Sequence, residues 1–532
     1  MNGLRTMNGV AWLAVSVIAG TLAACESPRG AGAPEPVTIG IAEPARLLPS
    51  STVDSNGTQV VAALWTPLVT FDPSGRPVMA AAESITSSDQ KVWTITLKSG
   101  WTFHNGESVT SDNYIRAWNN AAYGPNGAVG SNNFRRIEGY ADMQSVGGAP
   151  PRATTLSGLR KVDDLTFTST LASPFSAWET ALGNNVFDPL PNAAFDGDGR
   201  VRKDFEQAPI GQGPFQMDGV WNHYRNIAVT RFPNYNGARP KVSTINFRMY
   251  QDQTAMYDDL IAGNLDVQSR IPPSRLDSAP DDLGGRLRRT PSSYIGFIAV
   301  PNDIPAYTAD IRRAISMGFD RKEITDRVFH GAFTPATSWV SPAVPGYRAD
   351  TCKPYCDYDP TAARSLWNRA GGVPGNKIVL YYDSDDGYRE WVDPVCDQLA
   401  STLSVDCQGR PVAQLADARD QADAQARVIS TAWSFDYPSI EDYLTPLYAT
   451  GAHGNDGGYT NPRFDAALAR GDAASTPDAA ITAYQQAEDI LANDMPVIPT
   501  WFGQNVLGYS TRVSHVDVDA RANVDLVTLS TR

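Results

Sequence analysis

Segments with two different spacings of apolar residues alternate along this chain, and that alternation is the strongest constraint on its fold. Residues 37–41, 91–98 and 164–171 exchange apolar and polar side chains with a period of two, which is typical of half-buried strands. Other segments repeat apolar residues at helical spacing, and they are residues 112–122, 310–317, 321–329, 360–370, 388–403 and 478–492. Ser111 or Asp112 is expected to cap the first helix. Interleaved strands and helices predict an α/β or α+β fold.

The N-terminus carries an export signal. Arg5 precedes an apolar run over residues 10–19, and Leu22-Ala23-Ala24-Cys25 follows, which resembles the lipobox of bacterial lipoproteins. The run is too short for a membrane helix, which needs roughly 20 apolar residues. We expect residues 1–24 to be a signal peptide and Cys25 to be lipidated. The alternative is an ordinary signal peptide with an incidental cysteine.

A tether and a large folded part follow the signal. Residues 25–36 are rich in Gly, Pro, Ala and Ser and predict a flexible link, so the fold should start near Val37. With 42% hydrophobic residues, the 532-residue chain can bury several cores and should form two or three domains. Loops near Asn184 and just before Arg289 are the expected divisions.

The chain is acidic, with 58 Asp and Glu against 44 Lys and Arg, giving a formal net charge of -14. Removal of residues 1–24 makes it one unit more negative, because Arg5 is the one charged residue there. Such a surface argues against a nucleic-acid partner.

Four cysteines remain besides Cys25: Cys352, Cys356, Cys396 and Cys407. An even number in an exported chain predicts two disulfides. Three pairings are possible, and the local one, Cys352 with Cys356 and Cys396 with Cys407, needs the least rearrangement of the chain. The rival interpretation is a four-cysteine zinc site, although neither pair has the two-residue spacing of zinc knuckles.

The sequence carries no common catalytic motif: it lacks Gly-x-Ser-x-Gly, His-Glu-x-x-His, a phosphate-binding Gly-x4-Gly-Lys-Ser/Thr loop and Gly-x-Gly-x-x-Gly. Its five histidines are far apart in the chain, so a histidine metal site is not expected. We therefore predict no catalytic residues, no metal and no cofactor, and interpret the chain as a protein that is not an enzyme.

Several segments, in order, resemble the oligopeptide- and dipeptide-binding group of ABC-transporter substrate-binding proteins, also called extracellular solute-binding protein family 5. The segments are residues 64–72, 82–84, 92–98, 101–112, 209–215, 231–235 and 312–321. The strongest match is the stretch formed by residues 82–84, 92–98 and 101–112, which ends in Trp101-Thr102-Phe103-His104-Asn105-Gly106-Glu107-Ser108-Val109-Thr110-Ser111-Asp112. The matches extend over nearly the whole mature chain.

The resemblance implies a three-lobed α/β fold of the periplasmic-binding-protein type, class II, with the ligand in a cleft between two lobes. Residues 37–60, 186–289 and 495–532 would form lobe I, residues 61–185 lobe Ib, and residues 290–494 lobe II.

The same resemblance suggests a peptide site. The segment 431–438 resembles the family segment whose aspartate accepts the ligand's α-ammonium, which makes Asp436 the candidate amine partner. The backbone of Trp433, Ser434 and Phe435 would pair with the peptide as an added strand, opposite the loop at residues 52–55, which contributes Val53 and Ser55. Asp436 could instead cap a local turn, and Trp433 could pack in the core.

The partner of the ligand's carboxylate is less defined. A position that holds arginine in an oligopeptide binder falls on Ser430 here. Arg389 lies near the place where dipeptide binders have an arginine and is the candidate, with a surface arginine paired with an acid such as Glu390 as the alternative. Ligand length therefore stays open.

The expected partners are a short peptide, ABC permease subunits and the membrane through the lipid on Cys25, with the protein monomeric and on the outer face of the cell membrane. Three alternatives remain. The ligand could be a non-peptide solute such as haem, a nickel complex, glutathione or an oligosaccharide, the protein could be a non-transport regulator of the cell envelope, or it could be an enzyme.

Overall fold

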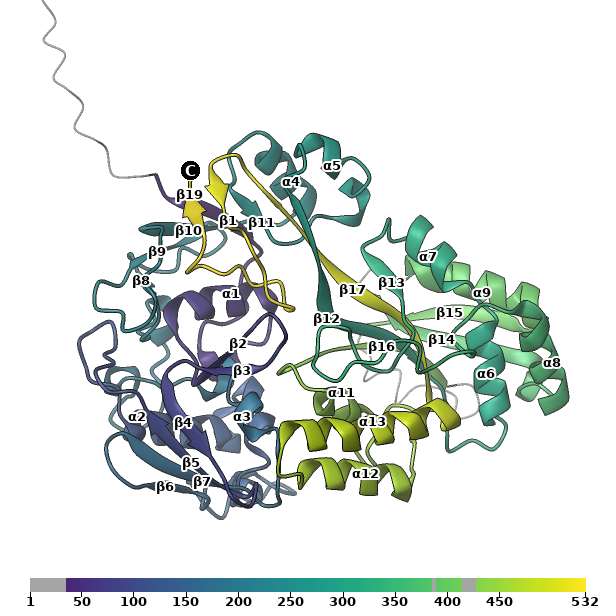
Figure 1. Cartoon of the computed structure of the whole chain (residues 1–532), viewed down its shortest axis with the longest axis horizontal. Coiled ribbons are helices and arrows are strands. Elements are labelled where there is room, and N and C mark those ends of the chain that lie inside the picture. Colours follow the sequence, from purple (N-terminus) through teal and green to yellow (C-terminus); the bar gives the residue numbers. More distant parts are fainter. Residues whose placement is uncertain (1–34, 385–388, 414–426) are drawn as a thin grey trace, which may run out of the picture. The chain divides into compact units, whose positions relative to one another are not determined.

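Two long antiparallel strands form the centre of the largest sheet. They are β12 (Leu287–Ala299) and β17 (Val497–Tyr509), each of 13 residues. In the computed structural model, which describes residues 35–384, 389–413 and 427–532, these strands cross from one half of the sheet to the other (Figure 1). Their pairing shifts register between Pro291 and Ile295 and again between Gly296 and Phe297. The predicted division between lobes at residues 289 and 290 lies within β12 and stays a prediction.

The sheet has eleven strands among the described residues. Its order is β15 (Asp406–Val412), β14 (Lys377–Asp383), β16 (Arg427–Ser434), β12, β17, β11 (Val267–Gln268), β1 (Val37–Ile41), β10 (Thr244–Met249), β9 (Asn226–Arg231) and β8 (Phe215–Met217), with β13 (Phe333–Pro335) paired to β17. Strand β14 runs parallel to both β15 and β16, and β1 runs parallel to β10 and β11. The sheet is therefore mixed, with parallel groups on both sides of the central pair.

A separate four-stranded antiparallel sheet has the order β4 (Ala82–Thr86), β5 (Val92–Leu97), β7 (Thr166–Thr170) and β6 (Leu159–Lys161). Helix α2 (Ser111–Ala122) contributes Tyr114 and Trp118, whose rings pack on Phe167 of β7 with centroids 5.8 Å and 5.4 Å away. Two small pairs complete the strands: β2 (Val69–Phe71) with β3 (Pro77–Met79), and β18 (Val513–Ser514) with β19 (Ser530–Thr531).

The helices occupy three parts of the chain. Helices α1 (Ser55–Leu64), α2 and α3 (Trp178–Ala181) come first, then α4 (Gln253–Ile261) and α5 (Ala279–Asp282). The remainder are α6 (Ala309–Met317), α7 (Arg321–Arg327), α8 (Pro360–Ala370), α9 (Arg389–Leu403), α11 (Glu441–Tyr448), α12 (Pro462–Asp472) and α13 (Pro477–Asp494). The green helices α6 to α9 lie near the edge formed by β14 and β15 (Figure 1).

Buried apolar side chains gather in separate cores. One contains β1, α1 and the four-stranded sheet, and another contains the C-terminal half of β12 with β14, β16 and the helices after residue 309. A small third core lies around α4 and α5. Each half of the large sheet thus has its own buried side chains.

The predicted strands and helices are confirmed within a few residues, as β1, β5 and β7 and as helices α2, α6, α7, α8, α9 and α13. The predicted cap of α2 is wrong by one residue. Thr110 has the extended backbone of a cap, and Asn113 Oδ1 accepts the Thr110 backbone N–H at 2.9 Å. Ser111 is instead the first helical residue, and its hydroxyl donates to the Asp163 carbonyl at 2.5 Å.

Both local disulfides are present, Cys352–Cys356 and Cys396–Cys407, with Cα atoms 5.6 Å and 4.9 Å apart. The prediction of local pairing is confirmed. The second bond joins α9 to β15, the outer strand of the large sheet.

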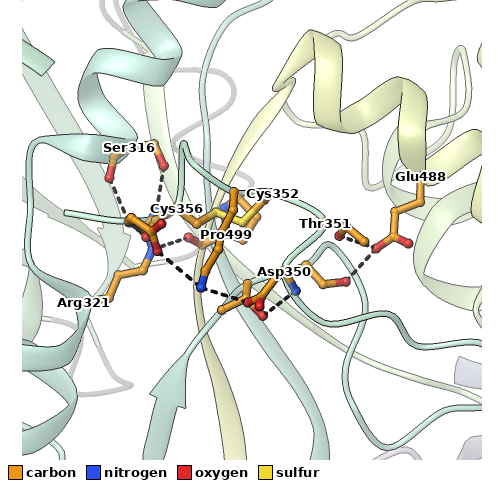
Figure 2. Close-up of a disulfide and its surroundings, with 12 residues drawn as sticks. Ser316, Arg321, Asp350, Thr351, Cys352, Cys356, Glu488 and Pro499 are labelled. Atoms are coloured by element: carbon orange, nitrogen blue, oxygen red, sulfur yellow. Dashed lines mark hydrogen bonds and ion pairs between the residues drawn. A yellow bond between two sulfur atoms is a disulfide. The ribbon is translucent and has the colours of Figure 1, made fainter. Parts of the chain in front are cut away.

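The Cys352–Cys356 turn contributes to a buried arginine site (Figure 2). Arg321 is 3% exposed, and its guanidinium donates to the carbonyls of Ser316, Cys356 and Pro499 at 2.8, 3.1 and 2.9 Å. Burial lowers the pKa of Arg321, and the hydrogen bonds from the guanidinium offset the cost of burying its charge. This arginine ends the family-like segment 312–321 and has a structural role.

Candidate functional site

Asp436 lies just after β16, in the short loop before α11. Its backbone is held on both sides: its N–H donates to Asp442 Oδ2 at 2.7 Å, and its carbonyl accepts from Asn184 Nδ2 at 3.1 Å. Among the residues that the structure describes, no group donates a hydrogen bond to the half-buried carboxylate of Asp436. The backbone of Asp436 is therefore fixed in place, and its carboxylate is available for a donor from outside the chain.

Burial and nearby charges act on this carboxylate in opposite directions. Burial raises the pKa of Asp436, while Arg521, Arg135 and His453 oppose that shift. Burial also raises the pKa of the neighbouring Asp442 well above its ordinary value, and the charge of Asp436 adds to that effect. Asp442 is 3% exposed, so of the two acids Asp436 is the more accessible to a charged ligand.

A cavity of about 220 Å³ lies beside Asp436. Thr52, Val53 and Ser55 line one part of it, and Ser434, Phe435 and Asp436 line another. The structure thus brings together, at one cavity, the predicted residues Val53, Ser55, Ser434, Phe435 and Asp436.

The loop at residues 52–55 is not a strand. Pro49–Ser51 form a short 3-10 helix, Thr52 and Asp54 are extended, and Ser55 is already the first residue of α1. Asp54 caps α1 by accepting the N–H groups of Asn56 and Gly57 at 3.1 and 2.8 Å. Its carboxylate is therefore used locally, and Val53, which is 64% exposed, contributes to the cavity wall.

Trp433 lines a neighbouring cavity of about 60 Å³, which also includes Asp436 and His453. The indole is half-buried against the core, and its Nε1 donates to Asp442 Oδ2 at 3.4 Å. Its ring centroid lies 6.0 Å from that of His453. Trp433 thus both packs on the core and walls a cavity.

Among the described residues, strand β16 is paired over only part of its second edge. Its residues Ser430–Ser434 pair with β12 on one side, whereas β14 pairs with β16 over residues 427–429 alone. On that second side no described strand pairs with Ser430–Ser434. Ser430 itself is fully buried, and no described group bonds to its hydroxyl. An extended peptide could add to this edge.

Arg389 lies apart from this cavity. Its side chain is 79% exposed, and its Nε lies 3.2 Å from Asp393 Oδ2. This exposed pair agrees with the alternative interpretation, a surface arginine paired with an acid, and the acid is Asp393, one helical turn on. The carboxylate-binding role of Arg389 stays a prediction.

Two further arginines, which no sequence motif indicates, line the 220 Å³ cavity: Arg270 and Arg521. Arg270 follows the short strand β11, and Arg521 lies in a turn near the C-terminus. Neither is in a motif, and only the fold brings these positions to Asp436.

A second charged group lies beside the site. Arg136 Nη2 is 2.6 Å from Glu441 Oε1 and its Nη1 is 3.5 Å from Asp472 Oδ2. Burial raises the pKa of Asp472 to about 6. These ion pairs join the segment before β6 to helices α11 and α12. Because the charge of Arg136 is paired with two acids of the chain, it is not offered to a ligand.

The described residues contain no group of three His, Cys, Asp or Glu side chains placed to hold a metal ion. None of the described helices combines the length and apolar character needed to cross a bilayer. Cys25 and the predicted signal peptide lie outside the described residues.

Comparisons with known proteins agree on one group. The family model described as "Bacterial extracellular solute-binding proteins, family 5 Middle" matches residues 76–455. The periplasmic murein peptide-binding protein MppA of Escherichia coli is 24% identical over 471 residues, which cover 86% of each chain. The glutathione-binding protein GsiB of Salmonella typhimurium is 25% identical over 501 residues, 92% of each chain.

The solved structures show the same fold. The structure of the Escherichia coli murein tripeptide binding protein MppA superposes with a TM-score of 0.74 at 22% identity and covers 93% of this chain and 98% of its own. The predicted periplasmic-binding-protein fold is thereby confirmed.

Proposed function

Because the chain belongs to the bacterial extracellular solute-binding proteins of family 5, we propose that it is the substrate-binding protein of an ABC importer and that its ligand is a short peptide. Membership of a solute-binding family agrees with the lack of catalytic motifs in the sequence. The observation that carries the peptide proposal is the carboxylate of Asp436, which borders a cavity and accepts no hydrogen bond from a described group.

A peptide supplies what this carboxylate lacks. The α-ammonium is a charged donor, and a charge-assisted bond to a half-buried carboxylate is among the stronger polar contacts in proteins. The peptide backbone could pair with Trp433 and Ser434, which lie beyond the residues of β16 that pair with β14 in the described part of the chain, and such pairing would give affinity without preference for side chains. Both relatives support this reading, since a murein peptide and glutathione are short peptides.

The partners and the location follow from the same proposal. The protein would be monomeric, would stay on the outer face of the cell membrane through a lipid on Cys25, and would deliver its ligand to ABC permease subunits. The motif at Leu22-Ala23-Ala24-Cys25 supports the anchor.

The first experiment measures thermal stabilisation of the compact unit Pro36–Arg532. Ligands that bind only the native state raise its Tm. An equimolar pool of di-, tri- and tetrapeptides with free termini should raise the Tm, and an oligosaccharide pool and haem should not. A shift with haem or sugars and none with peptides would contradict the proposal. Mass spectrometry of ligand that co-purifies with the protein would then identify the solute.

A further inference from the structure

Three arginines beside Asp436 have no acid partner in the described part of the chain. Arg270 and Arg521 line the 220 Å³ cavity, and Arg135 lines the smaller one next to it. Among residues 35–384, 389–413 and 427–532, no Asp or Glu oxygen lies within ion-pair distance of any of the three guanidinium groups. In a chain with a net charge of -14, such a local excess of positive charge is unexpected.

The acids near these arginines do not neutralise them. Burial raises the pKa of both Asp188 and Asp442 well above the ordinary range, although the charge of Arg521 opposes the shift of Asp188. Neither acid lies within ion-pair distance of these arginines. Asp519 accepts the backbone N–H groups of Arg521 and Asn523 at 2.9 and 2.8 Å, so its carboxylate caps its own turn. Among the described residues that line this cavity, Asp436 is the single carboxylate, and Arg270 and Arg521 are the two arginines.

The turn that carries Arg521 is held from two directions. On one side the Ser293 N–H of β12 donates to the Ala520 carbonyl at 2.8 Å, and Asn505 Nδ2 of β17 donates to the same carbonyl at 3.2 Å. On the other side the Thr58 hydroxyl of α1 donates to Asn523 Oδ1 at 3.2 Å.

The backbone of this turn is also strained. Ala522, the residue after Arg521, has a φ of 68°, which a side chain with a Cβ rarely adopts. A strained turn fixed by the central strands and by α1 holds Arg521 at the cavity wall before any ligand arrives, and this reduces the entropy cost of binding.

We propose that Arg270 and Arg521 are the carboxylate-binding residues of this site, and that the ligand is a short peptide with one ammonium and two carboxylates. The inference rests on the proposed peptide-binding function and specifies the charges that the peptide carries. The ammonium pairs with Asp436, and the two carboxylates pair with the two guanidinium groups, which are suited to bidentate contact with planar anions.

The test uses isothermal titration of the unit Pro36–Arg532 with matched tripeptides. Glu or Gln replaces each alanine of tri-alanine in turn, which gives three pairs that differ by one negative charge. In at least one pair, the Glu peptide should bind about 10-fold or more tightly than its Gln counterpart. The variant Arg521→Gln should lose that preference, and Arg270→Gln should reduce it. The control Arg202→Gln removes an exposed arginine paired with Asp204, and it should leave the preference unchanged.

The outcomes separate this inference from the proposed function. If the peptides bind and every Gln peptide binds as well as its Glu partner, the inferred charges of the ligand are wrong while peptide binding stands. If Arg521→Gln keeps the full Glu preference, the assignment of Arg521 is wrong. If none of the six peptides binds the wild-type protein, both the proposed peptide-binding function and the inferred charges of the ligand are wrong. Loss of folding is checked by the Tm of each unliganded variant, which should match that of the wild type because the Arg521 guanidinium has no described partner to lose.

Discussion

The Asp442 Oδ2 atom accepts the backbone N–H of Asp436 at 2.7 Å, six residues earlier in the chain. The same oxygen accepts from Trp433 Nε1 at 3.4 Å. One buried acid therefore positions both the candidate ammonium partner and the indole that walls the neighbouring cavity. Asp442 is a positioning residue, because it acts on the ligand through Asp436.

Two substitutions of Asp442 should distinguish its role as a hydrogen-bond acceptor from the effect of its charge. Asp442→Ala leaves two N–H groups without an acceptor, so we expect it to lower the free energy of unfolding by about 2 kcal/mol and to weaken peptide binding. Asp442→Asn keeps a carbonyl oxygen and should restore most of the affinity. Urea unfolding and peptide titration measure the two effects. Equal peptide affinity in Asp442→Ala and wild type would show that Asp436 does not depend on this contact.

His104 should make stability depend on pH. Burial lowers its pKa to about 4, from an ordinary value of 6.5, and its Nδ1 accepts the Gly211 N–H at 3.2 Å. Between pH 6.5 and 4, His104 is therefore protonated in the unfolded chain and neutral in the folded chain. The free energy of unfolding is highest above pH 6.5 and falls as the pH drops toward 4.

The matched variant is His104→Gln, which has no group that titrates in this range. Its stability deficit relative to wild type should shrink by about 2 kcal/mol between pH 7 and pH 4.5, as measured by urea unfolding at several pH values. Parallel pH profiles for the two proteins would contradict the assigned shift.

Gly211 permits a close approach of two motif segments. A Cβ at this position would lie 1.9 Å from the Leu64 carbonyl oxygen. Because the Leu64 carbonyl belongs to the backbone and cannot rotate away as a side chain would, Gly211→Ala should lower the free energy of unfolding by about 3 kcal/mol. Gly197→Ala is the control, since nothing lies within 4 Å of a Cβ there and Gly197 does not have a positive φ. A difference in Tm of less than about 2 °C between the two variants would refute the packing argument.

The lipid anchor is tested at Cys25. In a bacterial host grown with labelled palmitate, the full chain should carry label and sediment with membranes, whereas Cys25→Ser should be unlabelled. Label retained in Cys25→Ser would place the lipid elsewhere, and an unlabelled wild type would leave an ordinary signal peptide as the correct interpretation.

The sequence predicted local features well and long-range ones poorly. The helix predicted at residues 360–370 is confirmed as α8, because its spacing, its Asp359 cap and Gly371 at its end are all local signals. The central strands β12 and β17 were not predicted, since both are buried and show no simple alternation. The motif around His104 marked the family, and in the structure that residue holds the backbone of Gly211, so a motif can be structural.

The candidate site was predicted in part for the same reason. Asp436 was identified through its segment's resemblance to a family segment, and the structure brings it to the predicted Val53 and Ser55. Arg270 and Arg521 are separated from Asp436 by 166 and 85 residues of chain, and neither has a local pattern that indicates a function. They reach one cavity because β11 and β12 pair with β17, and because the turn that carries Arg521 contacts α1.

The central claim is that Asp436 pairs with a ligand ammonium, and the most direct test compares Asp436→Asn with wild type. The Tm is measured with a tripeptide pool that has free amino termini and with the same pool after N-acetylation. Wild type should be stabilised far more by the free pool, and Asp436→Asn should lose this advantage, because removal of one partner of a desolvated charge pair costs about 2 to 5 kcal/mol. If Asp436→Asn responds to the free pool as strongly as wild type does, the ammonium is not bound by Asp436 and the account is contradicted.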